Sequence, residues 1–469
     1  MTDLIAGTLH RLSSQLPGRV SLSGQDRYAA ATAIWAKSDS TPRAVVHCLT
    51  AADVQAAIRA ARSCDLPLSV RGGGHDWAGR ALCDGLVLDL SGMMRVDHYL
   101  ENSTARVGGG TRAAALLAAV ESFGMAAVTG SCGSVGMAGL TMGGGYGPLI
   151  GRFGLALDNL LGAEVVLADG RIVTAVHDCE EELFWALRGG GGNFGVITDM
   201  HLQLHYLPSV CSGMLVYPFA EARTVLEGCA DIAASATDDL TVQLGLATGA
   251  DGEPVVLVMP TWCGAVKEGE ARVAPFMRLG TLLAGAAETM PYRASLAAFD
   301  PFIVDGQRTF METCWIPALQ GGCIALFIEV MKRAVSPGCA LLTHEFKGAA
   351  SRRPADATAF GLRRDHLLVE MLATTDARAD AQEQLRQRAW ATDALRAFDA
   401  VALPGGYPNL LPRADADRAR SSFGSNADRL SRAKRHYDPD NVFRSAIPLP
   451  SPARPDAPAL ILPHTGPLA

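Results

Sequence analysis

The chain has 469 residues, of which 49% are hydrophobic and 19% are charged, and it carries a net charge of −7. This length is too great for one compact core, so two domains, or one domain with a large insertion, are expected. The acidic balance argues against a nucleic-acid partner, because neutralising phosphates requires a surplus of lysine and arginine. The composition is that of a globular protein rather than of a disordered chain.

The N-terminal segment and the cysteines bear on the cellular compartment. Residues 1–19 contain no basic stretch followed by an apolar run of signal-peptide length, and no apolar run in the chain is long enough to span a bilayer. The eleven cysteines form no CxxC pair, which favours free thiols in a reducing compartment. We therefore expect a cytoplasmic protein without a membrane partner or a metal site. The sequence does not indicate an oligomeric state.

Short apolar strands alternate with helices in roughly the first 205 residues. Strand-like runs are predicted at 44–49, 66–70, 86–90, 105–109, 163–175 and 195–205, and helices at 51–64 and 111–124. Between them the glycines crowd into 71–79, 108–110, 130–147 and 188–195. Glycine at such positions allows the backbone to approach another group closely.

The pattern changes after about residue 206. Longer alternating runs appear at 240–247, 254–264, 339–346 and 366–375, together with a helical segment at 379–398. This predicts an antiparallel sheet covered by helices. From about residue 405 the chain regains the character of its first part, with a helix predicted at 428–437, and the final stretch from residue 447 is proline-rich and expected to be extended.

The simplest arrangement is an α+β protein with one cofactor domain built from both ends of the chain. That domain is predicted to comprise residues 1–205 and 405–469, and a substrate domain of residues 206–404 is inserted between its two parts.

Two glycine-rich segments contain candidate reactive side chains. Residues 71–75, with the sequence RGGGH, directly follow an apolar strand, so their backbone N–H groups can converge on an anion. Their spacing matches neither GxGxxG nor the Walker pattern, and a tight turn with a structural histidine is also consistent with them. Cys132 lies among the glycines of 130–147, which favours an accessible thiol, although a small buried thiol is the alternative.

Five segments together resemble one protein family, the berberine bridge enzyme-like oxidases of the vanillyl-alcohol oxidase/p-cresol methylhydroxylase superfamily. The segments are RGGGHDWAG (71–79), GSCGSVGMAGLTMGGGYG (130–147), RFGLALDNLLGAEVVLADGRIVTA (152–175), ELFWALRGGGGNFGVIT (182–198) and YDPDNVF (437–443). The likeness covers both ends of the predicted cofactor domain, whereas the substrate portion matches only in layout. It implies a two-lobed FAD-binding domain of the p-cresol methylhydroxylase type, with the substrate domain above the flavin ring.

The resemblance also implies how FAD is held. His75 would bond through its imidazole to the flavin 8α-methyl group, and Cys132 would bond through sulfur to ring carbon C6; attachment through His75 alone stays open. An imidazole or a thiolate can make such a bond, and the tethered flavin should be a stronger oxidant. The pyrophosphate is expected against Gly72, Gly73 and Gly74. Further FAD contacts are expected from Arg71, Val135, Gly136, Gly139, Gly143, Gly144, Gly145, Asp158, Asn159, Val196 and Asn409.

Three positions qualify the resemblance. Val135 stands where the family controls access of oxygen to the flavin, and a side chain of its size is typical of an oxidase rather than a dehydrogenase. Gly133 replaces a proline found in many relatives, and Leu140 replaces a histidine found in some. Leu140 therefore removes one possible polar contact to the flavin.

The catalytic candidates are Tyr407, Glu345 and Glu370. Tyr407 matches the tyrosine of the family's Y-x-N segment. A phenol with a pKa of about 10 acts as a base at neutral pH only if a neighbouring cation, for which Lys347 or Arg71 is available, or the flavin lowers that pKa. Glu370 is a lone charge in an apolar strand, which is costly unless it is paired or lines a pocket.

Glu345 and Tyr407 each have an alternative explanation that requires no catalytic role. Glu345 shares one strand face with Thr343 and Lys347, and a solvent-facing position is its alternative. Tyr407 alternatively packs on the flavin.

These features predict an FAD-dependent oxidase that removes hydride from a C–H next to a hydroxyl or amine of a small molecule, in the manner of a secondary-metabolite enzyme, and reduces O₂ to H₂O₂. A content of 6% aromatic residues argues against an extended sugar-binding groove. An oxidative cyclase or a carbohydrate oxidase on the same fold is the alternative. A NAD-dependent reductase would lack the His75/Cys132 pair, and a non-catalytic flavin-binding protein would show no flavin bleaching with any substrate.

Overall fold

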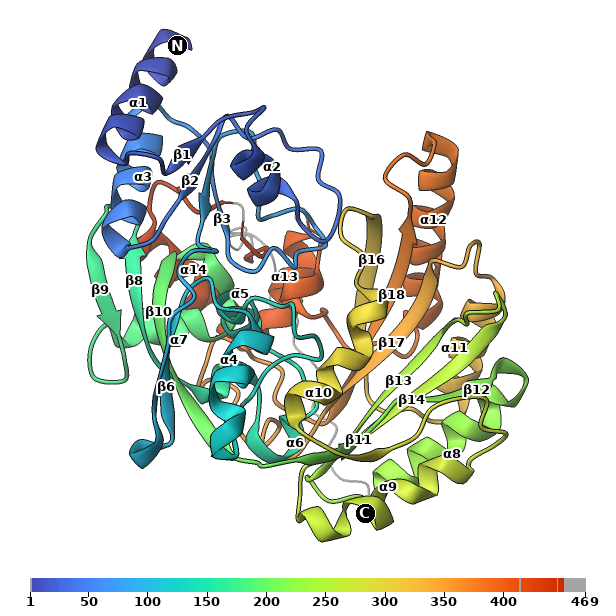
Figure 1. Cartoon of the computed structure of the whole chain (residues 1–469). Helices are drawn as coiled ribbons and strands as arrows, with labels where there is room; N and C mark the ends of the chain where they lie inside the picture. Colours follow the sequence, from blue (N-terminus) through green and yellow to red (C-terminus); the bar gives the residue numbers. More distant parts are fainter. Residues whose placement is uncertain (1, 413–414, 445, 451–469) are drawn as a thin grey trace.

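The computed structural model describes residues 2–412, 415–444 and 446–450, and its fold is α+β, as predicted. The described residues form three sheets, two in the N-terminal part of the chain and one formed by β11 to β18 (Figure 1). Most of the proline-rich stretch that was expected to be extended lies outside the described residues.

The first lobe of the cofactor domain is a four-stranded sheet in the order β1-β2-β4-β3, in which β2, β4 and β3 run parallel. Its elements are α1 (Thr2–Gln15), β1 (Val20–Ser21), α2 (Asp26–Thr32), β2 (Ala44–His47), α3 (Ala51–Ser63), β3 (Leu68–Arg71) and β4 (Leu86–Asp89). Helix α3 begins with a capping box between Thr50 and Asp53. Its residues Val54, Ala57 and Ile58 recur at helical spacing and are buried in the core of this lobe.

The second lobe is an antiparallel sheet in the order β5-β6-β10-β8-β9, with β7 also paired to β10. Its strands are β5 (Val96–Tyr99), β6 (Thr104–Gly108), β7 (Met125–Ala127), β8 (Leu160–Leu167), β9 (Ile172–Ala175) and β10 (Gly195–Tyr206). Its helices are α4 (Ala113–Val120), α5 (Met137–Gly143), α6 (Ile150–Phe153) and α7 (Glu181–Gly190). Because β10 pairs with three strands, it ties this lobe together.

The substrate domain contains an eight-stranded sheet in the order β15-β11-β14-β13-β17-β18-β16, with β12 paired to β14. Its strands are β11 (Val210–Ser212), β12 (Leu215–Pro218), β13 (Leu240–Thr248), β14 (Pro254–Trp262), β15 (Glu288–Met290), β16 (Arg308–Ile316), β17 (Cys339–Phe346) and β18 (His366–Thr375). Its helices are α8 (Ala222–Ala234), α9 (Gly269–Val273), α10 (Tyr292–Leu296), α11 (Gly321–Lys332) and α12 (Ala381–Phe398).

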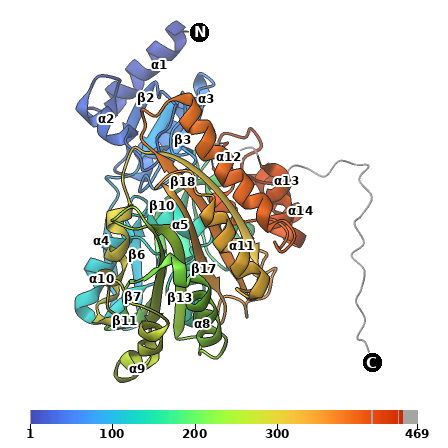
Figure 2. The same cartoon turned by 90° about the vertical axis from the view of Figure 1, so that its right-hand side faces the viewer.

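Helices α8, α11 and α12 cover one face of this large sheet (Figures 1 and 2). The alternation of the strands separates two sets of side chains. Val242, Leu341 and Val369 belong to the core beneath the helices. The residues that alternate with them along each strand point to the opposite face, which is turned towards the cofactor domain.

The chain returns to the cofactor domain after the substrate domain. Helices α13 (Ala416–Phe423) and α14 (Ala427–Tyr437) follow α12, and α14 packs against α7. Leu430 and Ala433 of α14 share one core with Leu183 of α7. The divisions predicted at residues 206 and 405 fall at the end of β10 and between α12 and α13.

Candidate active site

The loop after β3 meets a second glycine-rich loop backbone to backbone. A Cβ added to Gly73 would overlap the backbone nitrogen of Gly136, and one added to Gly136 would overlap the nitrogen of Gly73. Gly74 has a φ of +76°, in the left-handed region where a side chain is strained. Glycine is therefore required at these positions for the two loops to approach, and their approach places His75 and Cys132 beside one cavity.

A buried polar chain supports the first of these loops. Arg71 donates from Nη1 to Asp89 Oδ1 at 2.9 Å, and Asp89 Oδ2 lies 3.0 Å from His47 Nδ1. Ser21 Oγ lies 2.8 Å from the other ring nitrogen of His47. Burial opposes ionisation of Asp89, but the hydrogen bond from His47 and the charge of Arg71 outweigh it and lower its pKa to about 2. Arg71 is thus fixed beneath the loop as the partner of Asp89.

His75 and Cys132 both have strongly shifted pKa values. The imidazole of His75 stacks on Trp35, with ring centroids 4.7 Å apart, and its Nδ1 lies 3.3 Å from Ser134 Oγ. Burial lowers the pKa of His75 to about 4, so the ring is neutral at pH 7. Burial and the negative charge of Glu370 raise the pKa of the Cys132 thiol to about 12.

The cavity has a volume of about 380 Å³ and lies between the two lobes and the substrate sheet. The predicted cofactor residues that line it are Gly72, Gly73, Gly74, His75, Cys132, Val135, Gly136, Gly139, Val196 and Asn409. Leu140, which departs from the family pattern, lines it as well. Its size is within the range of small-molecule and cofactor sites.

Three strands of the substrate sheet contribute a polar cluster to the opposite side of the cavity. Glu370 comes from β18, His344 from β17 and Gln243 from β13. Glu370 Oε1 lies 3.2 Å from His344 Nε2, which is 3.4 Å from Gln243 Nε2. Around this cluster the walls are apolar, with Leu342, Leu368, Leu372, Phe299 and Ile303.

Tyr407 also lines the cavity and is held by its hydroxyl oxygen. The amide N–H of Gly145 donates to this oxygen at 2.9 Å, and Asn409 Nδ2 donates to it at 3.3 Å. Burial raises the pKa of Tyr407 to about 12 despite both hydrogen bonds. Its proton is therefore held at neutral pH. The cation whose charge acts on Tyr407 is Arg80, which corrects the expectation of Lys347 or Arg71.

Glu345 does not line this cavity, which corrects its prediction as a catalytic candidate. Its position in β17 has the parity of Leu341, which faces the helices, and its carboxylate accepts a hydrogen bond from the Val242 amide at 2.8 Å. Its other neighbour is Lys347, at 3.4 Å. Glu345 borders a smaller cavity of about 30 Å³ and satisfies a backbone group where β13 and β17 diverge.

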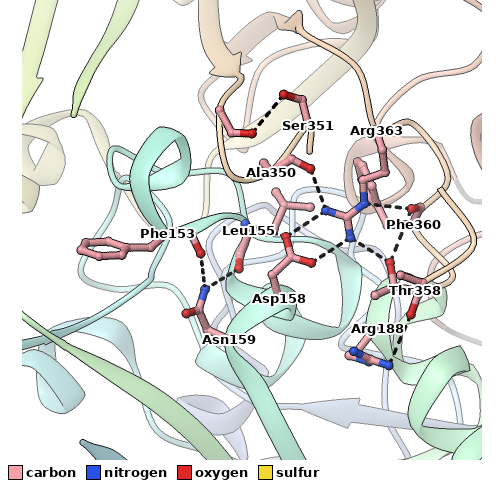
Figure 3. A network of polar contacts seen from close by, with 12 residues as sticks. Phe153, Leu155, Asp158, Asn159, Arg188, Ala350, Ser351, Thr358, Phe360 and Arg363 are labelled. Carbon is pink, nitrogen blue, oxygen red and sulfur yellow. Dashed lines mark hydrogen bonds and ion pairs between the residues drawn. The ribbon is translucent and has the colours of Figure 1, made fainter. Parts of the chain in front are cut away.

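Asp158 and Asn159 also lie outside the cavity lining, which corrects their prediction as cofactor contacts. Asp158 forms a two-pronged ion pair with Arg363, with N–O distances of 2.8 and 2.9 Å (Figure 3). The two side chains are 2% and 1% exposed. Asn159 donates to the carbonyls of Phe153 and Leu155. The pair of Asp158 and Arg363 therefore connects the cofactor domain to the loop between β17 and β18, whereas the hydrogen bonds of Asn159 stay within the cofactor domain.

The remaining predicted contacts lie one layer behind the cavity. A Cβ at Gly143 would overlap the side chain of Asn409, and one at Gly144 would press on the ring of Tyr407. Gly145 donates its amide to Tyr407, as described above. Gly143, Gly144 and Gly145 therefore position Tyr407 and Asn409 rather than lining the cavity themselves. Arg71 likewise acts through Gly74, whose added Cβ would lie 3.4 Å from Arg71 Nε.

Sequence reasoning missed several residues of the site: Trp35, Trp77, Arg80, Gln243 and His344. Strand alternation offered a signal for one of them, because it places His344 on the same face as Leu342, which pairs with Glu370. Arg80 and Trp77 follow the RGGGH segment directly, but no pattern marked them.

Three buried polar atoms at the wall of the cavity bear on its fit to FAD. Trp77 Nε1, Arg80 Nη1 and Ser131 Oγ are buried at its wall without a hydrogen-bond partner in the described part of the chain. Leaving such a group unpaired costs about 1–3 kcal/mol, so these atoms call for a polar ligand. Together with the side-chain-free lining of Gly72, Gly73 and Gly136, they fit a large ligand rich in polar atoms, as FAD is.

The described residues contain no helix long and apolar enough to cross a membrane. Nor do the histidine, cysteine, aspartate and glutamate side chains within those residues form a group of three suited to a metal ion.

Comparison with known proteins gives matches at both ends of the chain. The family described as FAD binding domain matches residues 42–175, and the family described as berberine and berberine like matches residues 398–450. The (R)-6-hydroxynicotine oxidase of Paenarthrobacter nicotinovorans is 30% identical over 459 residues, which cover 92% of this chain and 98% of that protein.

Solved structures share the whole fold. The crystal structure of 6-hydroxy-D-nicotine oxidase from Arthrobacter nicotinovorans has a TM-score of 0.81 and 29% identity, and the match covers 92% of this chain and 97% of that one. The wild-type BBE-like 1 protein of Physcomitrella patens has a TM-score of 0.84 at 22% identity, over 94% of this chain and 99% of that one. The chain belongs to the berberine bridge enzyme-like family of FAD-linked oxidases, with an FAD-binding domain of the p-cresol methylhydroxylase type.

Proposed function

We propose that this enzyme carries FAD bonded to both His75 and Cys132 and oxidises a small molecule at a C–H next to a hydroxyl or amine, with H₂O₂ as the second product. The observation that carries the proposal is that His75 and Cys132 line the same cavity as Tyr407 and Glu370. FAD, when bound, accepts the hydride and passes two electrons to oxygen.

The two proposed attachment residues differ in whether they must lose a proton before they can bond to the flavin. With a pKa of about 4, His75 is neutral at pH 7, so its free nitrogen lone pair is available for a bond to an electrophilic carbon. Cys132 has a pKa of about 12 and must first lose its thiol proton to become the nucleophilic thiolate. We therefore expect attachment through His75 to precede attachment through Cys132.

Proton transfer from the substrate is assigned to Glu370 with His344. A base must reach the proton that it removes, and both side chains line the cavity within 3.2 Å of each other. Tyr407 has its oxygen occupied by two N–H donors and holds its own proton, so it acts as a hydrogen-bond donor that orients the substrate heteroatom. Glu345 is left out of the reaction because it bonds to the Val242 amide.

The walls favour a compact substrate with an apolar body. Leu342, Leu368, Leu372, Phe299 and Phe302 line the cavity around the cluster of Gln243, His344 and Glu370, whereas sugars require many hydrogen-bond partners. The relative named for 6-hydroxynicotine supports the small-molecule class. The partners of this enzyme are therefore a small organic substrate and oxygen.

The test is the intact mass and the visible spectrum of acid-precipitated protein. The wild type should keep its yellow colour and show the mass of one attached FAD, His75→Ala and Cys132→Ala should each keep a single linkage, and the double variant should lose all colour. Cys179→Ala, at an exposed cysteine, serves as the control and should match the wild type. A wild-type protein that releases its flavin into the supernatant, or shows no substrate-dependent peroxide, contradicts the proposal.

A further inference from the structure

Arg80 has a free donor at the wall of the active cavity. Its Nε lies 3.0 Å from Asp76 Oδ1, and its Nη2 donates to the backbone carbonyl of Asn409. Nη1 is buried without a partner in the described residues, and the whole residue is 9% exposed. Asp76 and Asn409 thus fix the guanidinium fork and leave one N–H group for a ligand.

The surroundings of Arg80 place it near one end of the cavity. Asp76, its ion-pair partner, directly follows His75, and Asn409 donates to the hydroxyl of Tyr407. The charge of Arg80 also lowers the pKa of Tyr407, although burial has the larger and opposite effect. Arg80 therefore lies between the proposed attachment residue and the tyrosine that orients the substrate.

The charged side chains at the wall of the cavity distinguish Arg80 from its neighbours. Among the described residues that line the cavity, Arg80 is the only arginine or lysine, whereas Asp76 and Glu370 are both acidic. Any negative charge that develops on a ligand here meets one fixed cation. Electrostatic stabilisation by a preorganised cation in a buried site is a large catalytic effect.

We propose that Arg80 donates its free N–H to the flavin ring and stabilises the negative charge that the ring acquires on reduction. This rests on the proposed attachment at His75, which sets the end of the cavity that holds the ring. Hydride transfer brings two electrons and one hydrogen nucleus to ring atom N5, while the proton of the substrate heteroatom passes to Glu370. The ring thereby gains one negative charge. Oxygen then takes the two electrons with two protons, one from N5 and one from Glu370, and leaves as H₂O₂.

The experiment measures the effect of Arg80 on the electrostatic potential at the flavin ring, and it needs no substrate. Sulfite adds to N5 of oxidised flavin and places a negative charge on the ring, so its dissociation constant reports a neighbouring cation. Flavin-loaded Arg80→Gln should bind sulfite at least tenfold more weakly than the wild type. Its two-electron reduction equilibrium should shift at least tenfold towards the oxidised form, which corresponds to about 30 mV.

Two further variants separate charge from hydrogen-bond geometry. Arg80→Lys keeps the charge without the rigid fork and should give intermediate values. Arg112→Gln removes an exposed arginine that donates to the carbonyl of Gly73, and its sulfite affinity should stay within twofold of the wild type. If Arg80→Gln loads too little flavin to be measured, Arg80→Lys carries the comparison.

Three outcomes overturn the proposal. Unchanged sulfite affinity and potential in Arg80→Gln would show that the cation does not act on the ring. Reduced flavin content with a normal potential in the loaded fraction would assign Arg80 to the pyrophosphate instead. Equal effects of Arg80→Gln and Arg112→Gln would point to general charge alone. Failure of the proposed function has a different signature, since a missing covalent linkage or missing peroxide is read from the wild type and not from sulfite binding.

Discussion

The cofactor domain contributes ten glycines to the described lining of the cavity, and these present only backbone to the ligand, whereas the substrate domain contributes no glycine and presents side chains. On the first wall, Gly72, Gly73 and Gly136 bring two loops into contact and leave N–H groups open to the ligand. On the second, Gln243, His344 and Glu370 project from three neighbouring strands into an apolar surface. Gly73 and Gly136 of the first wall tolerate few changes in sequence, because a Cβ added to either one overlaps the opposite loop. A side-chain wall can be altered residue by residue without changing the fold.

The largest effect is expected from adding one carbon atom at the contact between the two glycine-rich loops of the first wall. Gly73→Ala places a methyl group on the nitrogen of Gly136, so the loops must separate. We expect loss of essentially all covalently bound flavin, measured by the absorbance of acid-precipitated protein. Gly322→Ala, where the added carbon meets no atom within 4 Å, is the control and should load normally. Normal loading of Gly73→Ala would mean that the loop contact is dispensable.

On the side-chain wall the expected effect is on catalysis rather than on loading. Glu370→Gln removes the proposed proton acceptor and should lower kcat/KM by about 10²–10⁴-fold with full flavin content. Glu345→Gln serves as the matched control, because it alters a carboxylate on the next strand that faces away from the large cavity. Equal losses of kcat/KM in the two variants would refute the assignment of Glu370 as the base.

The buried ion pair that connects the two domains should contribute to the free energy of unfolding. Asp158→Asn leaves the buried charge of Arg363 uncompensated, and breaking such a pair costs about 3–5 kcal/mol. Urea unfolding of the flavin-loaded protein should reveal this loss as a lower midpoint. Replacing both partners with apolar residues, as in Asp158→Leu with Arg363→Met, should recover part of it. A single variant as stable as the wild type would show that the ion pair does not hold the two domains together.

The smallest expected effect concerns Tyr407. Because burial raises its pKa to about 12, the phenol stays protonated as the pH rises through 10, the ordinary tyrosine value. We therefore expect no change in kcat/KM near pH 10 that depends on Tyr407. The wild type and Tyr407→Phe should have pH profiles of the same shape in that range. The variant itself loses one neutral hydrogen bond to the substrate, worth about 0.5–1.5 kcal/mol, and should lower kcat/KM by roughly tenfold or less. A rise of kcat/KM with pH that Tyr407→Phe abolishes would restore the tyrosine as the base, because a base acts only after it has lost its proton.

The same contrast explains what could be predicted from the sequence. The α+β fold and the strands of the substrate sheet followed from alternation, whereas FAD followed from the resemblance of five segments to the berberine bridge enzyme-like oxidases. Glu345 and Glu370 were both catalytic candidates on strands, and their opposite orientations came from a register between β17 and β18 that no local pattern contains. Asp158 was mistaken for a ligand contact because its partner, Arg363, lies 205 positions along the chain.

The packing of α14 against α7 has a consequence for when the cofactor can be incorporated. Leu430 and Ala433 complete a core whose other members include Leu183 and Met137, and Met137 immediately follows Gly136 of the second loop. During synthesis on the ribosome this core stays open until α14 has emerged, long after His75 and Cys132 have been translated. We therefore expect the proposed flavin attachment to require α14, so that nascent proteins stopped before this helix should lack bound flavin.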